Sequence, residues 1–176
     1  MLRVPTTLPD DVEQLVHDTI GCCIEVHRQL GPGLPERAYA KAIGLELIAT
    51  GISFEREKRY EVEYRGELLC SVYLDFIVAD RVVLEVKAVQ ALAAIHHAQV
   101  LNYMRIAHVR AGLLINFNVA VLKEGIRSLR GPVFAVSQRD LKLLLVATRS
   151  PVRRATSPSS LVPTRRRSVR ASRSAS

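Results

Sequence analysis

Residues 72–87, with the sequence V-Y-L-D-F-I-V-A-D-R-V-V-L-E-V-K, place charged side chains inside a strongly strand-forming stretch. Valine, isoleucine, phenylalanine and tyrosine dominate both halves, and the break at 79–81 predicts two strands joined by a tight turn. Side chains alternate across a strand, so Glu85 and Lys87 should face the same way. A hairpin of this length can also bring Asp75 beside Glu85.

This hairpin would gather two carboxylates and one ammonium at one end of a mostly apolar sheet. Charges are costly to bury unless they are paired or bind a metal. The arrangement therefore suits a metal-dependent phosphodiester hydrolase. The alternative is that Glu85 and Lys87 form an exposed cross-strand ion pair, but the flanking sequence is too apolar for an exposed edge strand.

The length of 176 residues suits one domain, and 48% apolar residues are enough to close a core. The sequence has no uninterrupted apolar run of about 18 residues and no apolar signal-peptide core at its start. We therefore expect a cytoplasmic protein that makes no use of a membrane. The cysteines include no C-x-x-C pair, so zinc, iron–sulfur and disulfide frameworks are not expected.

The net charge of +8 is concentrated at the carboxyl end of the chain. Residues 149–176 contain eight arginines and no acid, while basic and acidic residues balance in residues 1–148. We predict one folded domain over 1–148 and a disordered, Arg/Ser-rich basic tail over 149–176. This tail can contact nucleic-acid phosphates without sequence preference, or it can be a solvated extension without a function.

Apolar periodicity and turn residues predict an α/β chain in the order helix, helix, three strands, helix, strand. A Gly-Pro-Gly turn ends the first helix and a glycine ends the second. The expected helices are 10–30, 35–50 and 92–108, and the expected strands are 58–64, 67–78, 82–89 and 111–117. Residues 121–136 should add a strand or turn, and 141–147 a short helix.

With Asp75 and Glu85-x-Lys87 on neighbouring strands, the chain resembles the PD-(D/E)XK nuclease superfamily. The resemblance implies a three-strand meander plus a further strand in a mixed sheet flanked by helices. Leu74 stands where the superfamily pattern nominally has proline. This position varies widely in the superfamily.

Four further motifs sharpen the resemblance. They are E-V-H-R-Q-L-G-P at 25–32, G-L-P-E-R-A-Y at 33–39, H-A-Q-V-L-N-Y at 97–103 and G-L-L-I-N-F-N at 112–118. Together with the hairpin, they look like the small bacterial and archaeal GxxExxY proteins, a branch of that superfamily. The likeness covers roughly residues 10–130.

The resemblance implies a site for Mg²⁺ or Mn²⁺. Asp75 and Glu85 would supply carboxylate ligands and Val86 a backbone carbonyl, since hard cations prefer oxygen. Lys87 would orient the attacking water or stabilise negative charge developing on the phosphate. Glu36 would point at the metal directly or through water, although a glutamate in a first helical turn is also explained by the helix dipole.

Four helical residues are weaker candidates: Gln99 for the site itself, and Tyr39, His27 and Tyr103 for supporting positions around it. Gln99 would lie near Lys87 and the phosphate, or be an exposed polar residue one turn before Tyr103. Tyr39 would orient Glu36 or fill the core. His27 could approach the site from the first helix, or be a structural histidine.

We therefore predict a metal-dependent nuclease that acts on nucleic acid, most favourably DNA. The alternative is a module on the same scaffold that binds nucleic acid or another protein without cleaving. The intact acids and lysine argue against lost activity. Aromatic residues make up only 5% of the chain, which favours recognition of the phosphate backbone over base stacking.

Overall fold

The computed structural model describes residues 8–131, which form a five-stranded mixed sheet flanked by helices. The predicted α/β class and the order of its elements are confirmed. The short helix expected at 141–147 and the basic tail at 149–176 lie outside the described residues.

Helix α1 (Asp10–Leu30) has the predicted bounds, and α2 (Glu36–Ala49) is one residue shorter at each end than predicted. α1 is followed by Gly31, whose φ of 64° is left-handed and therefore favours glycine. Pro35 precedes α2 rather than entering it, so Glu36 is the first helical residue. The loop between the helices is thus only five residues long, and Glu36 follows it directly as the start of α2.

Strands β1 (Phe54–Tyr64), β2 (Glu67–Val78) and β3 (Val82–Lys87) form the expected antiparallel meander. β1 begins four residues earlier than its alternation indicated, because pairing with β2 extends to Phe54. The β2–β3 turn is tight, with the Arg81 N–H donating to the Val78 carbonyl oxygen at 2.9 Å.

After β3 the chain crosses the sheet through α3 (Ala94–Ile106) and returns as β4 (Ala111–Asn116), parallel to β3. The region predicted as a strand or turn contains both a helical turn, α4 (Leu122–Gly125), and the antiparallel strand β5 (Ile126–Arg130). The strand order is therefore β1-β2-β3-β4-β5, with β3 at the centre.

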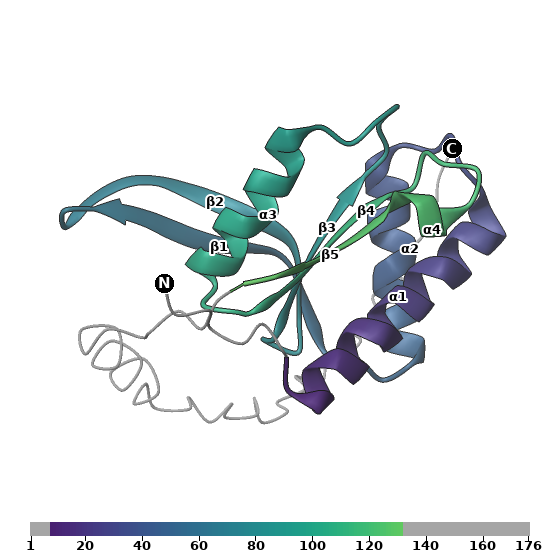
Figure 1. Ribbon diagram of the computed structural model, residues 1–176, viewed down its shortest axis with the longest axis horizontal. Coiled ribbons are helices and arrows are strands. Elements are labelled where there is room, and N and C mark those ends of the chain that lie inside the picture. Colours follow the sequence, from purple (N-terminus) through teal and green to yellow (C-terminus); the bar gives the residue numbers. More distant parts are fainter. Residues whose placement is uncertain (1–7, 132–176) are drawn as a thin grey trace, which may run out of the picture. The chain divides into compact units, whose positions relative to one another are not determined.

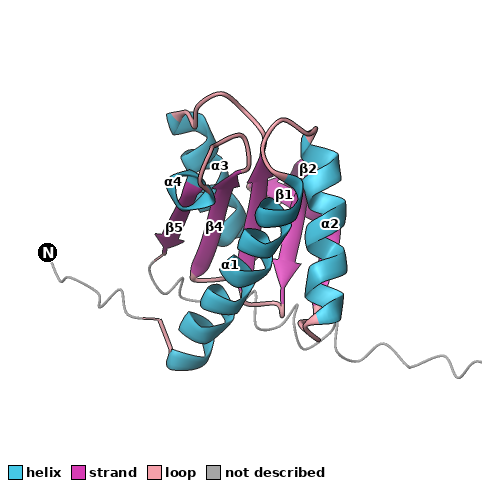
Figure 2. Cartoon of the chain, turned by 90° about the vertical axis from the view of Figure 1, so that its right-hand side faces the viewer, coloured by secondary structure: helices cyan, strands magenta, loops and turns pink. Residues whose placement is uncertain are grey.

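Helices cover the two faces of the sheet unequally, with α1 and α2 on one face and α3 on the other (Figures 1 and 2). Leu84 and Val86 of β3 pack in the cluster that includes α1 and α2, whereas Val83 packs with α3. The outer half of the β1–β2 hairpin extends away from this body (Figure 1). The central strand β3 is thus buried on both faces, and any charge on it must be accommodated in the interior.

No helix within residues 8–131 is long and apolar enough to cross a membrane.

Candidate active site

The ladder between β2 and β3 stops immediately before the two predicted acids. Phe76 pairs with Leu84 as the last antiparallel pair, and the same register continued by one step sets Asp75 opposite Glu85. There the Asp75 Oδ2 accepts the backbone N–H of Val86 at 2.9 Å. A carboxylate thus takes over the role of a strand partner, which fixes Asp75 against the end of β3.

Glu85 is the most deeply buried charged residue of this group. It is 2% exposed, and its Oε1 accepts a hydrogen bond from Lys87 Nζ at 2.5 Å. Its other oxygen, Oε2, is buried without a hydrogen-bond partner among the described residues. Such an orphaned acceptor is costly, so the site offers a binding position for a cation or a water.

Glu36 approaches the same group from the start of α2. Its Oε1 lies 3.9 Å from Lys87 Nζ, and its side chain is 42% exposed whereas that of Lys87 is 13% exposed. Lys87 therefore lies between a buried carboxylate and one at the solvent edge. The structure brings together Asp75, Glu85, Val86, Lys87 and Glu36.

Burial raises the pKa of both acids in this cluster. Burial raises the pKa of Glu85 to about 7, and the nearby charge of Asp75 contributes to this rise against the hydrogen bond from Lys87. Burial also raises the pKa of Asp75, opposed by the Val86 N–H. Burial alone would lower the pKa of Lys87, but its hydrogen bond to Glu85 and the surrounding carboxylates raise it instead. Lys87 therefore stays charged, but its positive charge does not fully offset the burial of the two acids.

Tyr39 holds the loop that leads into Glu36. Its ring is fully buried and stacks on Phe117 with centroids 4.5 Å apart. Its hydroxyl donates to the carbonyl oxygen of Gly31 at 2.7 Å and accepts the N–H of Leu34 at 3.0 Å. Tyr39 therefore both fills the core and fixes the backbone just before Glu36.

Asn116 was not singled out from the sequence, although a buried polar residue at the end of an apolar strand is a detectable signal. It is 2% exposed and lies beside Lys87 in the β3–β4 register. Its amide donates to the carbonyl oxygen of Val89 at 2.8 Å, and its Oδ1 accepts the N–H of Val89 at 3.0 Å. Asn116 thus fixes the chain that leaves Lys87.

Two further candidates, His27 and Gln99, form hydrogen bonds to groups other than the acids and Lys87. His27 donates to the Val119 carbonyl oxygen at 2.9 Å, which ties α1 to the loop after β4 and fits the structural alternative. Gln99 donates to the Tyr103 hydroxyl at 2.9 Å, and both are half-buried on α3. This bond fixes the side chain of Gln99 on its own helix.

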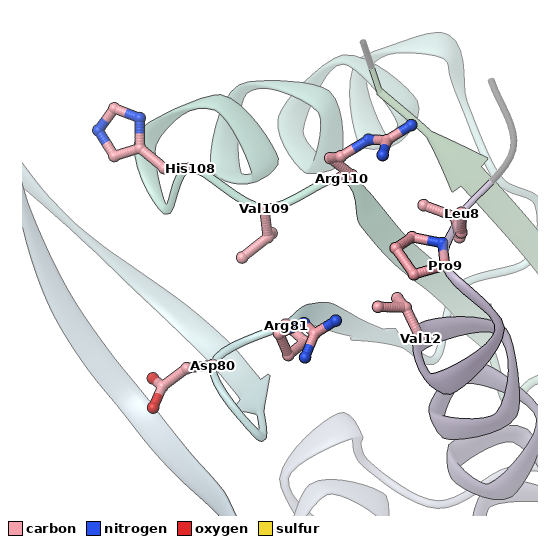
Figure 3. A pocket seen from close by; sticks show the side chains of 8 residues that line it. All are labelled: Leu8, Pro9, Val12, Asp80, Arg81, His108, Val109 and Arg110. Atoms are coloured by element: carbon pink, nitrogen blue, oxygen red, sulfur yellow. The ribbon is translucent and has the colours of Figure 1, made fainter. Parts of the chain in front are cut away.

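A separate pocket of about 160 Å³ lies at the opposite end of β3, beside the β2–β3 turn (Figure 3). Leu8, Val12 and Val109 form its apolar part, and Arg81 on its wall is paired with Asp11 at 3.0 Å. Its position separates it from the acids at the other end of the strand.

The fold and this cluster define a class of protein. It is an α/β domain with two acids and a lysine at the point where the pairing of β2 with β3 ends. The sequence model of the PD-(D/E)XK nuclease superfamily matches residues 13–129, more than half of the chain, so the chain belongs to that superfamily. Its members are usually phosphodiester hydrolases that use divalent metal ions. No curated protein and no solved structure matches the chain significantly.

Proposed function

We propose that the chain is a metal-dependent nuclease that hydrolyses phosphodiester bonds in DNA. The observation that carries this proposal is the buried carboxylate of Glu85, with one oxygen bound by Lys87 and the other without a partner. An ion pair built only for stability would have both oxygens satisfied. An unsatisfied oxygen in a cluster of acids is a cation-binding feature.

The donor set fits a hard cation. Asp75, Glu85 and the carbonyl of Val86 would hold Mg²⁺ or Mn²⁺, with water completing the coordination. Among residues 8–131, no three His, Cys, Asp or Glu side chains are grouped closely enough to hold a metal ion by themselves, so the proposed centre needs the Val86 carbonyl and water as further ligands. Once bound, the ion neutralises phosphate charge and lowers the pKa of a coordinated water.

The protein's own groups have separate roles in this proposal. Lys87, held by Glu85, places a fixed positive charge where the phosphate develops negative charge. Glu36 stands at the solvent edge, where it can hold and orient a water on its way to the reacting phosphate. Gln99, whose amide donates to the Tyr103 hydroxyl, would approach Lys87 and the phosphate from α3.

We further infer that the chain belongs to the GxxExxY branch, because each motif position has a local function. Gly33 adopts a φ of 98°, which is accessible mainly to glycine. Glu36 faces Lys87, and Tyr39 fixes the intervening loop. The spacing of Gly33, Glu36 and Tyr39 therefore places one carboxylate at the start of α2, facing β3.

The scarcity of aromatic residues favours recognition of the phosphate backbone over base stacking, and DNA is the substrate that we propose and test against RNA. The decisive experiment incubates the full-length chain with single-stranded, duplex and branched DNA, and with matched RNA, in Mg²⁺, Mn²⁺ or EDTA. We expect cleavage of DNA only with a divalent ion.

The matched variant is Asp75→Asn, which keeps an oxygen to accept the Val86 N–H but removes the charge. It should fold normally, lose cleavage and lose the stabilisation that added Mg²⁺ or Mn²⁺ gives the wild type. Cleavage by Asp75→Asn at the wild-type rate would refute the proposed site. Metal-dependent stabilisation of a wild type that cleaves nothing would favour the non-cleaving module.

A further inference from the structure

A cleft of about 200 Å³ opens between the start of α2 and the strands β1 and β2. It shares Asp75 and Glu36 with the candidate active site, but it also contains two arginines. Its walls are formed by Glu36, Arg37, Ala40, Arg56, Glu57 and Asp75. The sequence motifs assigned no role to Arg37, Arg56 or Glu57.

β1 is irregular where it lines this cleft. Glu57 has a left-handed φ of 50°, which a glutamate rarely adopts within a strand. The β1–β2 pairs include Arg56 with Phe76 and Lys58 with Leu74, but skip Glu57 and Asp75 between them. In a regular strand, Arg56 and Glu57 would point to opposite faces, whereas here both line one cleft.

β2 shows the same irregularity from the other side. Leu74 packs in the cluster beneath α3, whereas Phe76, two residues on, packs in the cluster beneath α1 and α2. Residues two apart normally share a face, so the alternation slips at Asp75. Backbone strain of this kind persists where the surrounding structure enforces it, and it is concentrated at functional sites.

Arg56 is held in place by apolar contacts. A methyl group added at Gly44 of α2 would lie 3.5 Å from the Arg56 Cδ, so the arginine stem lies against the bare helix backbone. Its guanidinium carbon lies 5.4 Å from the centroid of the Phe76 ring, within cation–π range. These contacts fix the guanidinium at the cleft before any ligand arrives.

The ion pair of Arg56 is loose by comparison. Arg56 Nη2 is 3.8 Å from Glu57 Oε1, beyond hydrogen-bond distance, and its side chain is 34% exposed. A salt bridge built for stability would be closer. This guanidinium therefore keeps donors that can serve a ligand entering the cleft.

We propose that Arg56, assisted by Arg37, binds a phosphate of the DNA backbone next to the scissile phosphate. The inference rests on the proposed nuclease function and extends it to substrate positioning. A guanidinium fork matches phosphate oxygens geometrically and remains charged at every relevant pH. It would also offset the repulsion between the acids of the cleft and the incoming phosphate.

The test compares Arg56→Gln with Arg59→Gln, a control on the same strand. Arg59 is exposed, donates to Ser71 Oγ at 3.0 Å and pairs with Glu61 at 3.1 Å. Both substitutions remove one positive charge from β1. Only Arg56 lines the cleft, so a difference between the two variants reports on the cleft rather than on net charge.

Binding is measured without turnover, by placing both substitutions in the full-length Asp75→Asn chain. Fluorescence anisotropy with a labelled 20-base-pair duplex in Mg²⁺ gives affinity against salt concentration. Arg56→Gln should reduce the slope of log affinity against log salt by about 1, the loss of one phosphate contact, and Arg59→Gln should leave it unchanged. Equal slopes in the two variants would overturn the inference.

Cleavage by the otherwise wild-type chain supplies the second measurement. Arg56→Gln should raise KM at least tenfold, with Arg56→Lys recovering only part because an ammonium lacks the planar fork. A purely structural role would lower the melting temperature and leave KM unchanged, which would also overturn the inference. Absence of cleavage by the wild type would refute the nuclease function instead, while the binding measurement still decides the role of Arg56.

Discussion

Replacement of Tyr39 by Phe would remove a single oxygen that joins α2 to the loop before it. The hydroxyl makes two hydrogen bonds to backbone groups, with Gly31 and Leu34, from a fully buried ring. Each hydrogen bond contributes about 0.5–1.5 kcal/mol net, so their loss should cost about 1–3 kcal/mol. The stacking on Phe117 remains, which keeps the cost below the about 3–5 kcal/mol of deleting an aromatic ring.

Urea denaturation at pH 7 measures this cost, with Tyr73→Phe as the matched control. Tyr73 is 58% exposed, so the same substitution there should change stability by less than about 0.5 kcal/mol. With an m value of about 2 kcal/mol per molar, Tyr39→Phe should lower the midpoint by about 0.5–1.5 M. Equal midpoints for the two variants would refute the argument that this hydroxyl anchors the loop.

Tyr39→Phe should also affect activity, because the loop that the hydroxyl anchors leads directly into Glu36. A looser loop lets the carboxylate of Glu36 leave its position near Lys87, so kcat should fall while Mg²⁺ affinity, set by Asp75 and Glu85, changes little. A parallel loss of metal affinity would mean that Glu36 is itself a strong metal ligand.

Two further predictions concern the charges of the site. In EDTA, the pKa of Glu85 is raised from its ordinary 4.5 to about 7 in the folded protein, so protonation of Glu85 favours the native state. The stability that this group contributes is therefore complete below about pH 4.5 and is lost as the pH rises through 7. The loss should reach at most about 3 kcal/mol by pH 8 in urea denaturation, and Glu85→Gln should flatten the profile; parallel profiles would show that Glu85 does not titrate there. Lys87→Ala should abolish cleavage but retain Mg²⁺ binding, measured by calorimetry, because an ammonium is not a metal ligand; wild-type turnover would exclude a catalytic role for Lys87.

The β2–β3 part of the site could be predicted because local rules determine it. Two strand-forming runs separated by three residues leave little freedom of register, so Asp75 must end opposite Glu85 once the hairpin forms. The Gly-Pro-Gly turn likewise fixed where α2 begins, and with it the approach of Glu36 to Lys87. These are consequences of short-range geometry, which sequence patterns record well.

The remainder depends on contacts between distant segments. Asn116 could be recognised as buried, but its bonds to Val89 follow only from the parallel pairing of β3 with β4. His27 lies against Val119, 92 residues away, and no local pattern indicates that contact. The sequence therefore identified side chains suited to the chemistry better than those that position them.

The irregularity at Glu57 has a different origin. The segment E-R-E-K at 55–58 alternates in charge and precedes most of the strand predicted over 58–64, and nothing in it indicates a left-handed residue. The left-handed Glu57 coincides with the step at which the β1–β2 pairing skips Glu57 and Asp75, and the carboxylate of Asp75 there accepts the Val86 N–H. Regular strand pairing is therefore lost on both sides of β2. Toward β3 this leaves the acidic site, and toward β1 it leaves the arginine-lined cleft. Sequence patterns that assume regular strands cannot predict the skipped pairing at Glu57 and Asp75. Such departures from local rules are expected at functional sites.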